Sequence, residues 1–233
     1  MKDADAYVIV FDVEGTLIDC VPQTIESWRQ TLAEHAFHFS HEELHRYSGM
    51  DAKLMLSGLL PDADEKLIKS LLDEQGERYR KKFLPQVKPF PGARDLFSAL
   101  ASDGHRLGLA TTSQADELRT YLRLLDITDD VSAAVCGDEV EREKPAPDMI
   151  KLAAAKLVSE VSAGLYVVGD TPYDAAAALA AGGKPVGTLG GGFSADQLTR
   201  AGCVRVASNL AEMLAMFRSL ARFALSLSSG EID

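Results

Sequence analysis

Cysteine is scarce in this chain of 233 residues, and its distribution excludes several architectures. The three cysteines, Cys20, Cys136 and Cys203, lie far apart, and no Cys-x-x-Cys pair occurs. An odd number of widely spaced cysteines does not support a disulfide framework or a cysteine-based zinc site. We therefore predict a reduced, cytosolic setting for the protein.

Basic residues and long apolar runs are also in short supply. Lysine and arginine total 24 against 35 aspartates and glutamates, which gives a formal net charge of -11. Nucleic acids and anionic membranes call for a basic surface, so we expect neither as a partner. The apolar run at residues 6–11 is too short for a signal-peptide core or a membrane span, and acidic residues precede it. The sequence thus predicts a cytoplasmic protein.

What the sequence does contain is a regular alternation of strand-like and helix-like segments. From residue 93 onward, helical patterns alternate with short apolar runs. This alternation predicts an α/β fold, a doubly wound parallel sheet with helices on both faces. The expected strands are residues 8–11, 106–110, 133–136, 165–168, 185–188 and 204–207.

The stretch that follows the first strand has a different character. A capping-box pattern begins at Ser40, and apolar residues recur at helical spacing within 65–83. No strand-like run occurs in this stretch. We therefore predict a core domain of residues 1–18 and 88–233 and an all-helical insert of residues 19–87, called the helical insert below.

Two pairs of carboxylates follow strands of the predicted sheet. Asp12 and Glu14 come directly after the first strand, and Asp170 and Asp174 follow the strand at 165–168. The carboxyl ends of parallel strands meet at one edge of the sheet, where open α/β sheets bind ligands. Crowded carboxylates repel one another, so a cation is expected among them. Asp12, Asp170 and Asp174 offer the oxygen ligands that Mg²⁺ prefers.

Two further strand ends carry groups suited to an anion. Thr111, Thr112 and Ser113 place hydroxyls where a strand gives way to a helix, and a helix N-terminus attracts phosphate. Lys144 follows the strand at 133–136 and can neutralise phosphate as a point charge. The sequence therefore predicts a phosphate site next to the carboxylates.

Taken in order, four motifs of the chain resemble those of the haloacid dehalogenase superfamily of aspartate-nucleophile hydrolases. They are Asp12-Val13-Glu14-Gly15-Thr16, Thr111, Lys144-Pro145, and Gly169-Asp170 with Asp174. The helical insert resembles the cap of the phosphoglycolate phosphatase and β-phosphoglucomutase branch. The resemblance covers nearly the whole chain and implies a phosphatase that acts on a small phosphorylated metabolite.

The resemblance also implies roles for individual residues. Asp12 would attack phosphorus and form an aspartyl-phosphate, so that two easier steps replace one difficult step. Thr111 and Lys144 would hold the phosphoryl oxygens, and Thr112 and Ser113 are neighbours that could share or take the role of Thr111.

The cofactor implied by the resemblance is Mg²⁺. Its ligands would be the Asp12 carboxylate, the backbone carbonyl of Glu14 and the Asp170 carboxylate, with Asp174 in support. A bound divalent metal offsets the repulsion between a carboxylate nucleophile and a phosphate.

Glu14 departs from the phosphatase pattern, which has aspartate at this position. The residue there protonates the leaving oxygen and then activates water, and such acid–base help is worth roughly 10²–10⁴-fold in rate. Glutamate keeps the carboxylate but reaches one methylene further. We predict that Glu14 serves in this role with altered geometry. The alternative is a catalytically weak relative that binds phosphate.

The helical insert contains two candidate substrate-contacting residues, Gly49 and Lys53. Phosphonoacetaldehyde hydrolases of the same superfamily form a Schiff base on a cap lysine, so an enzyme of that kind is one alternative, and a phosphoglucomutase-like enzyme is another. A 2-haloacid dehalogenase is a third, although those enzymes lack the Gly-Asp-Thr pattern found at 169–171. The sequence names no substrate and leaves both a monomer and a homodimer open.

Overall fold

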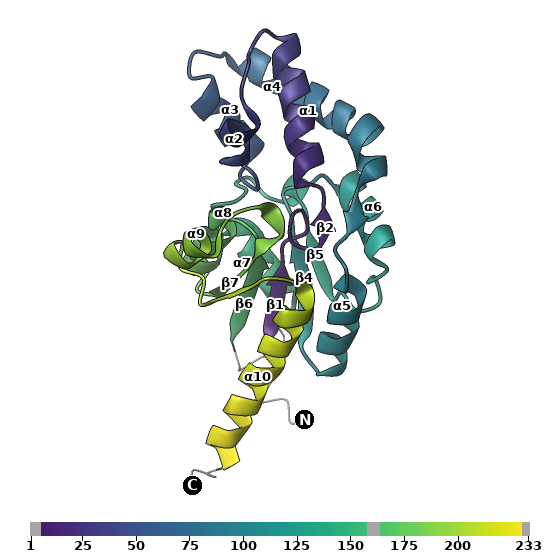
Figure 1. Ribbon diagram of the computed structural model, residues 1–233, viewed down its shortest axis with the longest axis vertical. Coiled ribbons are helices and arrows are strands. Elements are labelled where there is room, and N and C mark those ends of the chain that lie inside the picture. The colour runs from purple at the N-terminus through teal and green to yellow at the C-terminus, as the bar shows by residue number, and fades with distance from the viewer. Residues whose placement is uncertain (1–5, 158–163, 230–233) are drawn as a thin grey trace.

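A six-stranded parallel sheet lies at the centre of the protein in a computed structural model that describes residues 6–157 and 164–229 (Figure 1). The predicted α/β fold with a doubly wound parallel sheet is confirmed. Across the sheet, the strands are β5 (Ala133–Val135), β4 (Arg106–Ala110), β1 (Val8–Phe11), β6 (Leu165–Gly169), β7 (Lys184–Thr188) and β8 (Arg205–Ala207).

Helices cover both faces of the sheet because its strands are apolar on both sides. In β1 all residues are buried, and successive side chains point to opposite faces. Ile9 and Phe11 belong to one apolar cluster, in which the rings of Phe11 and Phe97 are 4.8 Å apart, whereas Val8 and Val10 belong to the cluster on the other face. The covering helices are α5 (Ala93–Ser102), α6 (Ala115–Leu125) and α10 (Leu210–Ser229) on the first face, and α7 (Asp148–Leu157), α8 (Pro172–Ala180) and α9 (Ala195–Arg200) on the second.

The strand order creates a binding position at the middle of the sheet. From β1 the chain proceeds to β4 and β5 on one side, and then crosses to β6, β7 and β8 on the other. The order therefore reverses between β1 and β6, which pair in parallel. In doubly wound sheets ligands bind at such a reversal, outside the carboxyl ends of the two strands.

The helical insert lies above this edge of the sheet in Figure 1 and has its own apolar core. Trp28, Leu32, Leu56 and Leu71 are among its buried residues. The capping box predicted at Ser40 is present, with the Ser40 hydroxyl accepting from the Glu43 N–H. The elements are α1 (Val21–Glu34), α2 (His41–His45), α3 (Ala52–Leu59), α4 (Glu65–Arg78), the π-helical turn η2 (Tyr79–Phe83) and the 3₁₀ turn η3 (Leu84–Gln86).

Two details at the base of the helical insert differ from the sequence prediction. The long helix expected over 65–83 ends as an α-helix at Arg78 and continues as the π-helical turn η2. The chain also forms two short strands, β2 (Ile18–Asp19) and β3 (Lys88–Pro89), which pair antiparallel where it enters and leaves the insert. Strands of two residues carry no readable periodicity. The division into two domains at residues 18 and 88 stays a prediction.

Within the described residues, no helix has the length and apolar character needed to cross a membrane.

Candidate active site

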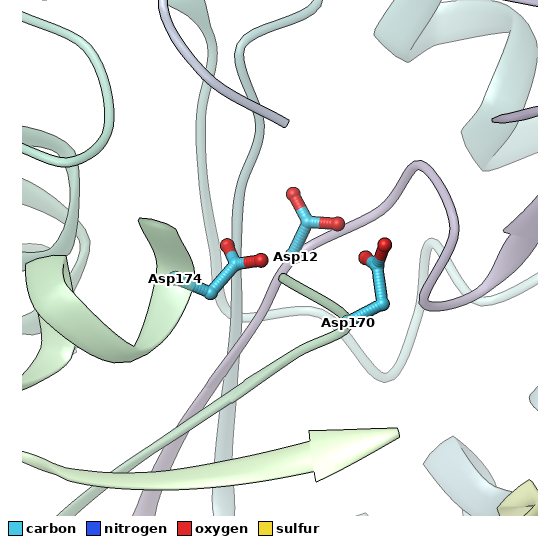
Figure 2. Close-up of side chains that lie close together, drawn as sticks. All are labelled: Asp12, Asp170 and Asp174. Atoms are coloured by element: carbon cyan, nitrogen blue, oxygen red, sulfur yellow. The ribbon is translucent and has the colours of Figure 1, made fainter. Parts of the chain in front are cut away.

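Three carboxylates converge at the reversal point of the sheet. Asp12 follows β1, Asp170 follows β6, and Asp174 lies in the first turn of α8. Each offers one oxygen, and these oxygens all lie within 4.8 Å of one another. Figure 2 shows the three side chains close together beyond the ends of β1 and β6. The predicted convergence of these aspartates at one sheet edge is therefore present.

Lys144 enters this cluster from the loop that precedes α7. Its side chain is buried, and its Nζ lies 2.5 Å from Asp12 Oδ1 and 2.8 Å from Asp174 Oδ1. Burial opposes the charged form of the lysine, but the two carboxylates raise its pKa above the usual value. For Asp12 the effects are reversed: burial raises its pKa, and the Lys144 ammonium lowers it. Lys144 is therefore held as a cation.

The charges and geometry of this cluster fit a divalent metal ion. Three carboxylates surround one ammonium, and burial together with the neighbouring Asp12 and Asp174 raises the pKa of Asp170, so a further cation here would be favourable. The Thr16 hydroxyl donates to Asp170 Oδ1 at 2.8 Å, whereas Asp170 Oδ2 is buried and has no hydrogen-bond partner among the described residues. Hard oxygen donors of this kind suit Mg²⁺. Asp12 and Asp170 are thus able to hold such an ion, with Asp174 beside them.

Two glycines allow the backbone to approach Asp170 closely. A Cβ at either Gly15 or Gly191 would overlap the Asp170 carboxylate. Gly15 also has a φ of +77°, in the left-handed region that side chains disfavour. The glycine in the motif after β1 is therefore required both by the turn and by the neighbouring carboxylate.

Asp174 has a second role as part of a helix cap. Thr171 is the N-cap of α8 and Pro172 its first residue. The Thr171 N–H and hydroxyl donate to Asp174 Oδ2 at 3.1 and 2.7 Å. This capping box holds one Asp174 oxygen, so that the other, Oδ1, faces Lys144.

The Glu14 side chain lies outside the three-aspartate cluster and contacts α6. The Tyr121 hydroxyl donates to Glu14 Oε1 at 3.0 Å, and the Tyr79 hydroxyl lies 2.7 Å from that of Tyr121. Because Tyr121 gives its proton to Glu14, Tyr79 is the donor in the tyrosine pair. Burial and repulsion from Glu117 raise the pKa of Glu14. The Glu14 carboxylate is not part of the three-aspartate cluster, and the role of its backbone carbonyl stays a prediction.

Tyr79, Glu117 and Tyr121 were not predicted from the sequence as site residues. One signal was available for two of them. Glu117 lies three residues after Gln114 in a capping box, and Tyr121 follows Glu117 by four residues, so both lie on one face of α6. Nothing in the pattern shows that this face looks toward Glu14.

The three hydroxyls after β4 divide into two groups. Thr111 is buried, and its Oγ1 accepts from the Ser113 N–H at 3.1 Å. Thr112 and Ser113 line a cavity between the core and the helical insert, and Asp12 and Glu14 line the same cavity. The roles of all three hydroxyls toward a phosphoryl group stay predictions.

The two candidates in the helical insert lie in different surroundings. Gly49 lines the cavity and touches Thr171, with a φ of +80°. Lys53 is exposed on α3 and does not line the cavity. The structure therefore brings Gly49, but not Lys53, to the candidate site.

Hydrogen bonds join the helical insert to the segments of the core that carry the site. The Asp51 N–H donates to the Lys144 carbonyl at 2.9 Å, and the Tyr173 hydroxyl donates to the Arg46 carbonyl at 2.6 Å. His45 Nε2 donates to the Gly191 carbonyl at 2.6 Å. The insert therefore covers the cluster in this conformation.

Glu143, which precedes Lys144, makes stability depend on pH. Burial and repulsion from Asp51 raise its pKa to about 7 from an ordinary value of 4.5. The folded protein therefore binds this proton more tightly than the unfolded chain does. The stabilisation of the folded protein by this proton is fully present below pH 4.5 and is lost as the pH rises through about 7.

We expect Glu143→Gln to remove this loss. Its free energy of unfolding should exceed that of the wild type by roughly 1–3 kcal/mol at pH 8 and by less at pH 5, as measured by urea unfolding. Glu141→Gln, at an exposed position of the same loop, is the matched control. A difference between Glu143→Gln and wild type that does not change with pH would contradict the expectation.

Comparisons with known proteins identify the family of the chain. A family profile described as haloacid dehalogenase-like hydrolase matches residues 9–188. The chain is similar to a phosphoglycolate phosphatase from Rhodospirillum rubrum, at 29% identity over 214 residues and 88% of each chain. It is also similar to the pyrophosphatase PpaX from Bacillus pumilus, at 28% identity over 80% of this chain and 85% of that protein.

The fold has a close counterpart among solved structures. A hydrolase from Pseudomonas syringae superposes with a TM-score of 0.84 at 27% identity, over 91% of this chain and 98% of that one. The family profile spans more than half of the chain. The sequence motifs, the sheet and the aspartate cluster therefore have one explanation: the chain belongs to the haloacid dehalogenase-like hydrolases.

Proposed function

We propose that the protein is a Mg²⁺-dependent phosphatase that hydrolyses a small phosphate monoester through an aspartyl-phosphate on Asp12. The observation that carries this proposal is the position of Asp12. Its carboxylate lies at the reversal point of the sheet, in contact with the Lys144 ammonium and within 4.8 Å of an oxygen of each of two further aspartates. The phosphatase and pyrophosphatase names of the relatives support a phosphoryl substrate.

In the first step Asp12 forms a bond to phosphorus while the bond from phosphorus to the alcohol oxygen breaks. The departing alkoxide needs a proton, and Glu14 is the residue proposed to supply it, because both Asp12 and Glu14 line the cavity. Lys144 and Thr111 are assigned to the phosphoryl oxygens.

In the second step water attacks the aspartyl-phosphate. Glu14 takes a proton from that water, the bond between Asp12 and phosphorus breaks, and inorganic phosphate is released with Asp12 restored. The helical insert, joined to the Lys144 loop by Asp51, excludes bulk water while the first step proceeds.

Asp12, Asp170 and the Glu14 backbone carbonyl are proposed to bind Mg²⁺, with Asp174 in support. Bound there, the ion supplies Lewis-acid stabilisation of the phosphoryl charge. Asp170 Oδ2, which is buried without a hydrogen-bond partner among the described residues, supports this assignment.

The structure weakens one alternative. A Schiff-base mechanism of the phosphonoacetaldehyde hydrolase kind needs a lysine at the substrate, whereas Lys53 is exposed and lies outside the cavity lining. Among the described residues, no lysine lines the cavity.

The test is a hydrolysis screen with phosphoglycolate, pyrophosphate, sugar phosphates, nucleotides and phosphonoacetaldehyde. We expect phosphate release in Mg²⁺, a loss of about 100-fold or more in EDTA, and recovery when Mg²⁺ is restored. Asp12→Asn is the control and should be inactive under all conditions. Turnover that persists in EDTA or in Asp12→Asn would refute the mechanism, and binding of phosphate without any turnover would instead support the phosphate-binding alternative.

A further inference from the structure

The cavity between the core and the helical insert is where the leaving group of a substrate must lie. It has a volume of about 130 Å³, and Asp12 and Glu14 form its core side. A protein cavity of about 150 Å³ can hold a benzene molecule, so this space suits an alcohol of a few carbon atoms. Phosphorus bonded to Asp12 would leave the rest of the ester inside this cavity.

The wall opposite the aspartate is largely apolar. Ile25 and Trp28 of α1, together with Met50 and Met55, form much of it. The polar groups on the same side include Gln75, whose amide donates to the Ser27 hydroxyl at 3.4 Å. Thus the helical insert presents neutral side chains to the cavity.

The charged residues of the cavity are acidic. Asp12, Glu14 and Glu117 line it, while no lysine or arginine does so among the residues that the structure describes. Lys144 lies outside the lining and is already paired with Asp12 and Asp174. Arg80 contacts Glu117 at 3.4 Å, but its side chain is 41% exposed and also lies outside the lining.

An anionic leaving group would therefore be buried without a partner. A buried charge without an opposite charge or hydrogen bonds is strongly disfavoured, and nearby carboxylates add repulsion. An alcohol without negative charge avoids both the burial of an unpaired charge and the repulsion by the carboxylates. Its apolar surface is also stabilised by burial against the apolar wall.

We infer that the substrate is a phosphate monoester of a small alcohol that carries no negative charge. This inference rests on the proposed phosphatase function and narrows it. This preference would distinguish the protein from enzymes that act on phosphoglycolate or pyrophosphate, because the leaving group of those substrates carries a negative charge of its own.

The test compares two esters of nearly the same shape, phosphoglycolate and its amide, O-phosphoglycolamide, with the wild-type protein in Mg²⁺. We expect kcat/KM for the amide to exceed that for phosphoglycolate by about 100-fold, because only the acid places a charge in the cavity. Equal or faster hydrolysis of phosphoglycolate would overturn the inference while leaving the phosphatase function intact. Failure to hydrolyse either ester, or any compound of the wider screen, would count against the function itself.

A pair of variants at Gln75 tests whether the lack of a cation in the cavity lining causes this preference. Gln75→Lys places a cation in the cavity wall, and Gln75→Met has similar length without the charge. We expect the ratio of kcat/KM for phosphoglycolate to that for the amide to be about 10-fold higher in Gln75→Lys than in Gln75→Met. An unchanged ratio in two folded variants would show that charge in the cavity does not set specificity.

Discussion

Replacing Lys144 with methionine is expected to lower the free energy of unfolding by about 3–5 kcal/mol in EDTA and to abolish turnover. The ammonium lies between Asp12 and Asp174, at 2.5 and 2.8 Å. Without it, the three buried aspartates keep no cation among the described residues that contact them. Urea unfolding in EDTA and in Mg²⁺ measures the effect, which should be smaller in Mg²⁺ because a bound cation compensates for the missing charge.

A double variant separates the structural role of Lys144 from its catalytic role. In Lys144→Met/Asp174→Asn one carboxylate has been neutralised, so much of the lost stability should return. Turnover should remain absent, since no cation contacts the phosphoryl oxygens from this side. Full stability in the single variant would contradict the ion-pair interpretation, and activity in the double variant would contradict the catalytic one.

Replacing Glu14 with glutamine is expected to lower kcat by roughly 10²–10⁴-fold. The amide can still accept a hydrogen bond from the Tyr121 hydroxyl, so the side chain should keep its position. What it loses is the ability to give and take a proton. Steady-state hydrolysis of the best ester in the screen measures the change.

Glu14→Asp is the matched control. It keeps the carboxylate but is too short by one methylene to preserve the contact with Tyr121. We expect its kcat to stay within about 10-fold of the wild type, because the acid–base group is retained. If Glu14→Gln turned over as fast as the wild type, the acid–base role would be excluded and the departure from the family pattern would be of no consequence for the chemistry.

Much of the core could be predicted because its signals are local. The strand 106–110 is predicted with the bounds that β4 has, and the capping box at Ser40 is predicted from its residue pattern. The aspartates could be placed together for a topological reason, since carboxyl ends of parallel strands share one edge. These inferences need no knowledge of side-chain packing.

The surroundings of Glu14 could not be predicted in the same way. Tyr79 and Tyr121 are 42 residues apart, and their contact depends on how η2 packs against α6. The position of Lys53 on the exposed side of α3 likewise depends on which face of a short helix turns inward. A sequence pattern gives the period of a helix but seldom its rotation relative to a distant partner.

The short ladder formed by β2 and β3 has a mechanical consequence. Ile18 pairs with Pro89 and Asp19 with Lys88, so the two chain crossings between the core and the helical insert lie side by side. A rotation of the insert bends both crossings at one place instead of pulling them apart. The ladder thus acts as a single pivot, and the hydrogen bonds that His45, Asp51 and Tyr173 make between the insert and the core must break if the insert rotates about it.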